Sequence, residues 1–334
     1  MKTFCLLFIS IFMAFTIVSV QSVSGQTIQE SLHVDLSKTL GFIMGQRFSL
    51  NRIKDEYPAL GLRVQKADLE FKTAFGIAEE NIKSALKDML KDKYSEYVAR
   101  MKKQLKSTLS PQQLNQDIAV LFLAEVESRA KGNVPSPILE TLLTYQFQYR
   151  PAEEFTKGYN RIFRTKGHPK AKGIDFQIRY PISWQPKEGE RPNIIQKFTS
   201  ENGRGLEMFL IMVKDIPLPP GYTLTQKDLD EFFTESELRG MVSDGGKFIS
   251  AKPIVLDNHK GAMILFDQSV QRLDLTLTMR NLHFIIIHGN KMVFIQCVIS
   301  ATPGKESKLQ ENFSRFELLF KMIANSFIIQ EQYK

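Results

Sequence analysis

The side chains that could ligate a metal ion or carry protons are few and scattered. The histidines stand at positions His33, His168, His259, His283 and His288. They form no zinc-binding pattern with another histidine, a cysteine or a carboxylate. His283 and His288 flank a short apolar run, which predicts that both lie at strand ends. The sequence therefore predicts no metal site and no cofactor-binding residue.

Candidate nucleophiles are equally sparse. Cys297 is the one cysteine outside the first 25 residues, and its neighbours in 294–299 are mostly apolar, as in a buried strand. Burial keeps a thiol protonated and inert, so a structural role is favoured over nucleophilic chemistry. The Gly-x-Ser-x-Gly turn of hydrolases and the phosphate-binding Walker loop are both absent. The sequence predicts no catalytic residue and a protein that is not an enzyme.

Basic side chains instead concentrate in one segment. No acidic residue interrupts the run Lys157, Arg161, Arg164, Lys166, Lys170 and Lys172, and the whole chain has a formal net charge of +8. The run predicts contact with an acidic protein or an anionic envelope component, including a peripheral contact with membrane headgroups. A solvated basic linker is an equally good interpretation. Nucleic acid is not an expected partner, because the chain has no binding motif for it and its first residues predict export.

The candidate partner-binding residues are Lys166, Lys170, Lys172, Trp184, Lys187 and Arg191. The last two bound a charged loop that follows Trp184. Trp184 is the only tryptophan, and such a residue can anchor a partner at an interface. A core position between a sheet and a helix is the favoured alternative for it.

The first 25 residues have the pattern of a signal peptide. Lys2 precedes the uncharged apolar run from Phe4 to Val20, and small residues follow at Ser24 and Gly25, where cleavage is expected. A retained membrane anchor is the alternative, because about 17 apolar residues lie at the lower limit for a membrane span. The chain is therefore expected to be exported, either to a periplasm or out of the cell, and to be soluble once cleaved.

Residues 26–150 predict a helical domain. Apolar side chains recur every three or four residues in two long runs, Leu36, Leu40, Ile43, Leu50 and Ile53, then Phe71, Phe75, Ala78, Ile82 and Leu86. Ser110-Pro111 predicts the start of a further helix that stops at Gly132. Gly41 and Gly45 predict a close helix crossing, either within the chain or between the two copies of a homodimer.

Residues 174–330 predict an antiparallel sheet flanked by helices. A basic linker with one short helix, residues 151–173, comes first. The apolar period then changes to two, with Ile174, Phe176 and Ile178 on one face. Gly289-Asn290 predicts a hairpin between two apolar strands. Helices are expected near 226–241 and at the end of the chain. The whole chain is expected to have an α+β fold.

The residues that follow the first predicted strand resemble a known family. Tyr180-Pro181-Ile182-Ser183-Trp184 is similar to the opening of the PsbP-like family, which includes DcrB-type proteins and the Ran-binding Mog-type proteins. The resemblance covers about residues 170–330. It implies a curved antiparallel sheet in an α/β/α sandwich that serves as a binding or assembly module, without catalytic residues that define the family.

A weaker resemblance concerns the helical half. Gly41, Gly45 and the segment Gly61-Leu62-Arg63-Val64 are similar to the helical dimerisation arm of FKBP-type isomerases, although the isomerase domain itself is absent. This resemblance implies association between two copies of the chain.

These observations leave three functions to compare. The leading prediction is an exported, non-enzymatic binding or assembly protein that docks an unknown protein or envelope partner. One alternative is a chaperone-like holder of exported chains, which would show an exposed apolar groove in residues 30–150. The other is a hydrolase with an unrecognised site, which would show a pocket of converging polar groups with shifted pKa values.

Overall fold

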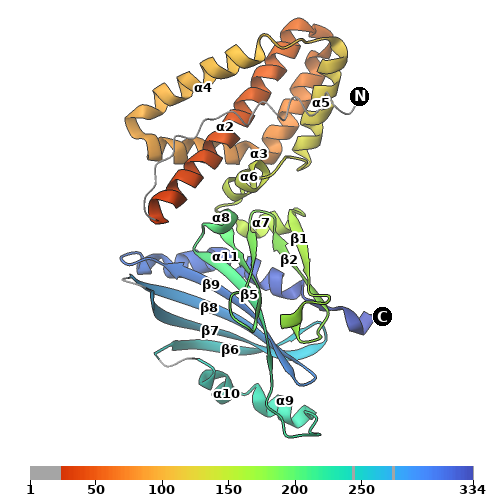
Figure 1. Cartoon of the computed structure of the whole chain (residues 1–334), viewed down its shortest axis with the longest axis vertical. Helices are drawn as coiled ribbons and strands as arrows, with labels where there is room; N and C mark the ends of the chain where they lie inside the picture. The colour runs from red at the N-terminus through yellow and green to blue at the C-terminus, as the bar shows by residue number, and fades with distance from the viewer. Residues whose placement is uncertain (1–23, 243–244, 273–274, 334) are drawn as a thin grey trace. The chain divides into compact units, whose positions relative to one another are not determined.

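The computed structural model describes residues 24–242, 245–272 and 275–333. The chain divides into two compact units, which adjoin in sequence between Gln146 and Phe147 (Figure 1). The predicted signal segment, residues 1–25, lies almost wholly outside the described residues. Within the described ranges, none of the helices combines the length and the apolar character that a bilayer span requires.

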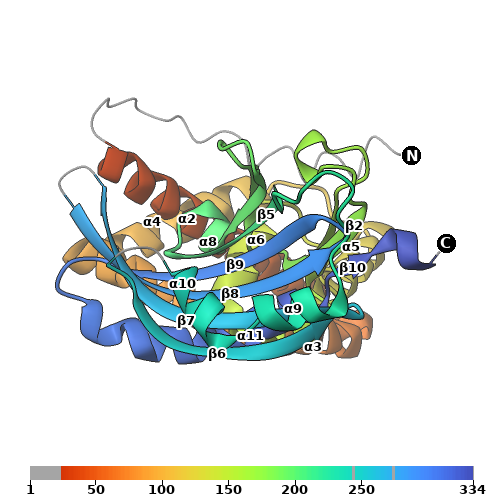
Figure 2. The ribbon, with the colours of Figure 1, turned by 90° about the horizontal axis from the view of Figure 1, so that it is seen from below.

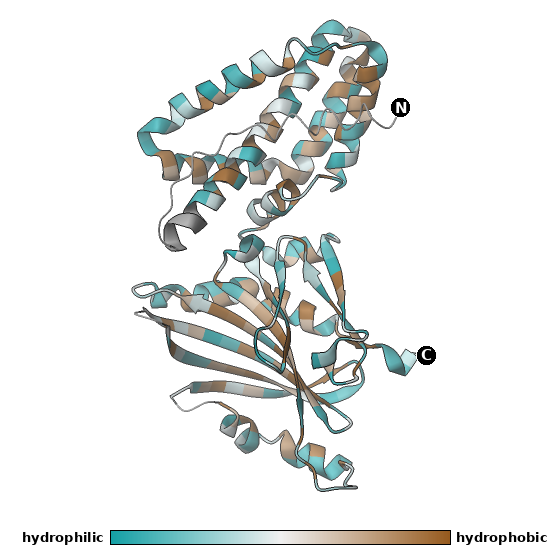
Figure 3. Cartoon of the chain, in the orientation of Figure 1, coloured by the Kyte–Doolittle hydropathy of each residue, from teal (hydrophilic) through white to brown (hydrophobic). Residues whose placement is uncertain are grey.

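The first unit is helical, as the spacing of its apolar residues predicts. Its elements are α2 (Ser24–Glu56), η2 (Pro58–Leu60), α3 (Gly61–Leu90), η3 (Lys91–Lys93), α4 (Tyr94–Leu109), α5 (Gln116–Ala130) and α6 (Ile138–Gln146). The apolar side chains of α2 and α3 meet in a core in which Leu36, Phe75 and Ile82 are fully buried. By contrast, α4 is mostly hydrophilic along its length (Figure 3).

The predicted helix start at Ser110 is wrong. Residues 110–115 form a turn, and α5 begins at Gln116, because the Asn115 side chain accepts a hydrogen bond of 2.9 Å from the backbone N–H of Ile118. Asparagine in extended backbone is a strong helix N-cap, and here it replaces the capping pattern that begins at Ser110.

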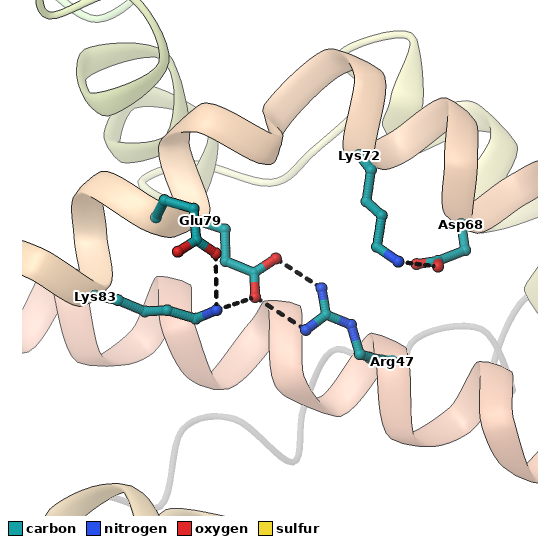
Figure 4. Close-up of polar contacts among 6 residues, drawn as sticks. Arg47, Asp68, Lys72, Glu79 and Lys83 are labelled. Carbon is teal, nitrogen blue, oxygen red and sulfur yellow. Dashed lines mark hydrogen bonds and ion pairs between the residues drawn. The ribbon is translucent and has the colours of Figure 1, made fainter. Parts of the chain in front are cut away.

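A buried carboxylate ties α2 to α3. Glu79 of α3 accepts two hydrogen bonds from the Arg47 guanidinium of α2, at 2.6 and 2.9 Å, and lies 2.8 Å from Lys83 Nζ (Figure 4). Burial opposes ionisation of Glu79, but the hydrogen bonds from Arg47 and Lys83 outweigh it and hold its pKa below the ordinary value. Glu79 is therefore a charged residue within the helical core.

The second unit is built on antiparallel sheets. A small sheet has the order β1-β2-β10, from β1 (Asn160–Arg164), β2 (Phe176–Pro181) and β10 (Ile328–Ile329). The large sheet has the order β3-β4-β5-β9-β8-β7-β6, from β3 (Gln185–Glu188), β4 (Ile194–Thr199), β5 (Glu207–Asp215), β6 (Lys247–Leu256), β7 (His259–Arg272), β8 (Leu275–His288) and β9 (Lys291–Ala301). The predicted hairpin is confirmed, because β8 and β9 are joined by Gly289-Asn290, with Gly289 at a φ of 58°.

Helices cover both faces of the large sheet. Helix α11 (Leu309–Asn325) packs on one face, with Phe313, Phe320 and Ile323 in the larger core. On the opposite face, α9 (Gln226–Phe232) and α10 (Glu235–Gly240) lie over the strands, and Leu238 of α10 joins a second cluster (Figure 2). The predicted α+β fold is therefore confirmed.

The predicted linker, residues 151–173, belongs instead to the second unit. It contains α7 (Pro151–Thr156), strand β1 and the turn η4 (Pro169–Ala171), and β1 pairs with β2 along its whole length. The short helix was predicted from the spacing of Pro151, Phe155, Tyr159 and Ile162, but α7 stops at Thr156, because Gly158 adopts a φ of 84° and turns the chain into β1.

Candidate functional site

The helical unit contains a large cavity. Its volume is about 600 Å³, and its walls come from α2, α4, α5 and the segment that leads into α6. The apolar part of the lining comprises Gly41, Phe42, Gly45, Met101, Leu105, Leu109, Phe122, Val134, Pro135, Pro137 and Ile138. Ligand sites in proteins have volumes of about 300–1,000 Å³ and mostly apolar walls, so this cavity has the dimensions of a binding site.

Small residues on α2 make room for this cavity. A Cβ atom added at Gly45 would lie 3.6 Å from Leu105 Cδ2 and 3.8 Å from Leu109 Cδ1, both on α4. These are ordinary contacts with side chains, so the close helix crossing that Gly41 and Gly45 predict stays a prediction. Helix α4 reaches α2 through two leucine side chains there.

One charged side chain is set into the apolar wall. The guanidinium carbon of Arg129 lies 4.8 Å from the ring centre of Phe42 and 5.7 Å from that of Phe122. Its Nη1 donates a hydrogen bond of 3.0 Å to Gln46, and its Nε donates one of 3.2 Å to Glu125. The Arg129 side chain is only 12% exposed, whereas that of Glu125 is 42% exposed. The cation therefore lies deeper in the wall than the acid that balances it.

The polar groups of the cavity are of few kinds. Among the described residues that line it there is no histidine and no cysteine, and its polar groups are mainly amides and hydroxyls. Such groups orient a ligand but do not exchange protons near neutral pH. The geometry thus fits an apolar site with one fixed cation.

The predicted partner-binding residue Trp184 lies in the core of the sheet unit. It is 3% exposed, and its ring centre lies 5.9 Å from that of Phe209 and 6.3 Å from those of Phe316 and Phe320. The core alternative therefore describes its position. An exposed anchor would need an open indole face, which the surrounding rings occupy.

The predicted basic residues lie in the same unit, and several of them are paired. Lys170 Nζ donates to the Gly189 carbonyl at 2.5 Å and lies 2.9 Å from Glu188, which lowers the pKa of that carboxyl. Lys170 thus joins the basic segment to the loop of residues 187–191.

The other four predicted basic residues are near the surface. Lys172 pairs with Asp215, and Lys187 lies 3.2 Å from Glu190. Lys166 and Arg191 are exposed. Partner binding by these residues stays a prediction.

The structure also joins two histidines that the sequence left apart. His259 Nε2 lies 2.9 Å from His288 Nδ1, and His259 Nδ1 lies 2.7 Å from the Asp257 carbonyl oxygen. Among the described residues, no three side chains of the metal-ligating types are grouped to hold an ion. The pair thus links the β6–β7 turn to the end of β8.

Both histidines were predicted at strand ends. His288 does end β8, but His283 lies inside that strand. The error came from the length of β8, which extends from Leu275 to His288 and takes in polar residues on the N-terminal side of the apolar run. Cys297 is buried in β9, and burial raises the pKa of its thiol well above the ordinary value. It is therefore an unreactive structural residue.

Comparisons with known proteins concern the fold. No family model and no curated protein matches the sequence. The structure is similar to cyanobacterial PsbP from Synechocystis sp. PCC 6803, with 13% identity over 51% of this chain and 92% of that chain and a TM-score of 0.33.

Two further solved structures match over a similar share of the chain. LpqN of Mycobacterium tuberculosis, involved in cell envelope biogenesis, matches with 12% identity over 54% of this chain and 96% of that chain and a TM-score of 0.30. The Ran-binding protein Mog1p of Saccharomyces cerevisiae matches with 10% identity over 51% and 95% and a TM-score of 0.32. These matches agree with the PsbP-like and Mog-type resemblance predicted from the sequence, and at such identity they concern the fold alone. The resemblance of the helical half to an isomerase arm stays a prediction.

His283 predicts a loss of stability in acid. Burial lowers its pKa from 6.5 to about 3, and its ring lies edge-on to Phe266 at 4.8 Å. Between these values the unfolded chain binds a proton that the native chain does not, so the free energy of unfolding falls as the pH falls. We expect this residue to contribute a loss of about 2 kcal/mol between pH 7.5 and pH 5.

Urea unfolding of the wild type and of His283→Phe at both pH values measures this contribution. The phenylalanine variant should lose about 2 kcal/mol less than the wild type over the interval. An equal loss in both proteins would show that His283 is not desolvated in the native state.

Proposed function

We propose that this protein is a binding protein whose helical unit holds an apolar ligand in the cavity between α2, α4 and α5. The cavity itself supports this most strongly. The space of about 600 Å³ is partly open to solvent, and most of its wall surface is apolar. Apolar surface that faces water in a groove is unfavourable unless a ligand covers it, and such grooves mark binding sites.

Of the predicted functions, the chaperone-like holder is nearest to this proposal, which places an apolar ligand where that prediction placed an exported chain. An exposed apolar groove in residues 30–150 was the feature expected of a holder, and the cavity is lined by residues from Ser37 to Ile138. A hydrolase would need converging reactive groups, which the described lining does not supply. Docking of an acidic protein or envelope partner by the sheet unit, through Lys166 and Arg191, is a second proposed contact, supported by the exposure of both side chains.

Plugging the cavity tests the proposed function. Nile red, a neutral dye that fluoresces in apolar surroundings, should bind the full chain saturably. In Gly45→Phe the new ring occupies the cavity beside Leu105 and Leu109, and we expect the dye to bind at least about tenfold more weakly. Gly45→Ala is the matched control, because its methyl group makes only ordinary contacts at 3.6 and 3.8 Å.

The control should keep the affinity of the wild type. It should also gain about 0.5–1 kcal/mol in stability, because alanine replaces glycine within a helix. Thr108→Phe, from an exposed lining position on α4, is a second plug in case Gly45→Phe does not fold. Undiminished dye binding by both folded plug variants would reject the cavity as the binding site.

A further inference from the structure

We propose that the ligand is a single-chain amphiphile with one anionic headgroup, such as a long-chain carboxylate, and that its headgroup lies against Arg129. This inference rests on the proposed function, because it concerns the same cavity. It adds the chemical class of the ligand and the residue that recognises it.

The form of the cavity favours an extended chain. The α2 residues that line it reach from Ser37 to Ser49, twelve positions along one helix. At 1.5 Å per residue this distance is about 18 Å, close to the length of an extended long-chain acyl group. The α4 residues that line it reach from Met101 to Leu109, and Gln112, beyond the end of that helix, also lines it. The space is therefore elongated along the helices.

The apolar wall favours an acyl chain over a polypeptide. A peptide brings a backbone N–H and C=O group at nearly every residue, and each costs free energy if it is buried without a partner. Gly41, Phe42, Gly45, Met101 and Val134 are buried residues of the wall, and their side chains offer no donor or acceptor. An acyl chain has no polar group to satisfy, so it loses nothing against this apolar part of the wall.

The charges of the wall favour an anionic head. Among the described lining residues, Lys38 and Arg129 are cationic and Glu125 is the one acid. Arg129 is held in place by Phe42, Phe122 and Gln46 and is largely screened from water. It also pairs with Glu125 at 3.2 Å, but that acid is the more exposed of the two, so the guanidinium would be shared between Glu125 and a headgroup. A cation in such surroundings attracts an anion more strongly than a solvated one does. Its planar guanidinium also suits a carboxylate.

The test compares two probes with the same hydrocarbon chain, of which one has a charged head and the other a neutral one. Cis-parinaric acid is a fluorescent long-chain carboxylate, and its methyl ester has the same chain without the charge. We expect the wild-type chain to bind the acid about tenfold more tightly than the ester near neutral pH. This preference should disappear below about pH 4, where the carboxylate is protonated.

Variants of Arg129 assign the preference to that residue. Arg129→Met replaces the guanidinium with an uncharged side chain of similar length. This variant should bind the acid and the ester equally and should still bind Nile red. Arg129→Lys keeps the charge and should retain part of the preference for the acid. It allows the test to proceed if the methionine variant does not fold. Arg63→Met is the control, because Arg63 pairs with Glu127 and is not among the lining residues of the cavity.

Each outcome separates the two proposals. Equal binding of acid and ester by the wild type would overturn the anionic ligand and leave the proposed function standing, provided that Nile red binds. Failure of Nile red, acid and ester alike would overturn both. An apolar peptide that displaces Nile red more strongly than the acid does would replace the amphiphile with a polypeptide segment.

Discussion

Replacing Glu79 with alanine is expected to lower the free energy of unfolding by about 2–3 kcal/mol. The Glu79 side chain is 8% exposed and bonds both Arg47 and Lys83, so its removal leaves two cations without their shared partner. Breaking a fully buried ion pair costs about 3–5 kcal/mol. The expected loss here is smaller, because the Arg47 and Lys83 side chains are each about one-third exposed and can recover some hydration.

Urea unfolding followed by circular dichroism would measure this loss. Glu80→Ala is a matched control, because Glu80 is the next residue and also pairs with Lys83, at 3.0 Å, but is exposed. Exposed pairs contribute about 0–1 kcal/mol, so this variant should remain close to the wild type. Similar losses in the two variants would show that the burial of Glu79 adds nothing to its pairing.

The difference should also depend on pH. The hydrogen bonds to Glu79 lower its pKa in the native state, so the stability that they provide is present above the ordinary carboxyl pKa of 4.5 and is lost as the pH falls below it. The gap between the wild type and Glu79→Ala should therefore narrow in acid.

Much of the fold follows from local pattern. The spacing of Leu36 and Leu40 reports one buried helical face, and alternation at Phe176 and Ile178 reports one buried strand face. The errors arose where a single residue determined where a helix begins or ends. Asn115 caps α5 several residues after the predicted start, and Gly158 ends a helix that the apolar spacing would extend.

The candidate site was harder to predict, because it depends on the space that remains between packed helices. Apolar spacing shows which face of a helix is buried but not whether its neighbour fills the space beside it. Gly41 and Gly45 were the one signal in the sequence, since they mark a place where α2 has no side chain. The position of Arg129 between two phenylalanine rings follows only from the packing of α5 against α2.

Contacts between residues far apart in the sequence could not be predicted either. His259 meets His288 because β7 and β8 pair with Gly261 opposite Ile286, and local sequence does not show this register. Likewise, Lys170 and Lys172 meet acids that stand well outside their own segment, at Glu188 and Asp215. A basic run in the sequence therefore overstated the net charge at that surface.

Replacing Trp184 with alanine is expected to cost about 3–5 kcal/mol, the usual cost of removing a large buried ring. Its indole is enclosed by Phe209, Phe316 and Phe320, so the variant leaves a cavity between the large sheet and α11. Trp184→Phe keeps most of the apolar volume and should lose about half as much or less.

The matched control is Leu318→Ala, an exposed position on α11 between Phe316 and Phe320, which should change stability by less than about 0.5 kcal/mol. Unfolding is followed by circular dichroism, because the alanine variant removes the only tryptophan. In the wild type, the emission of Trp184 should shift to longer wavelength on unfolding, as water reaches the indole. A loss below about 1 kcal/mol in Trp184→Ala would contradict a core role and return Trp184 to the surface, where a partner could bind it.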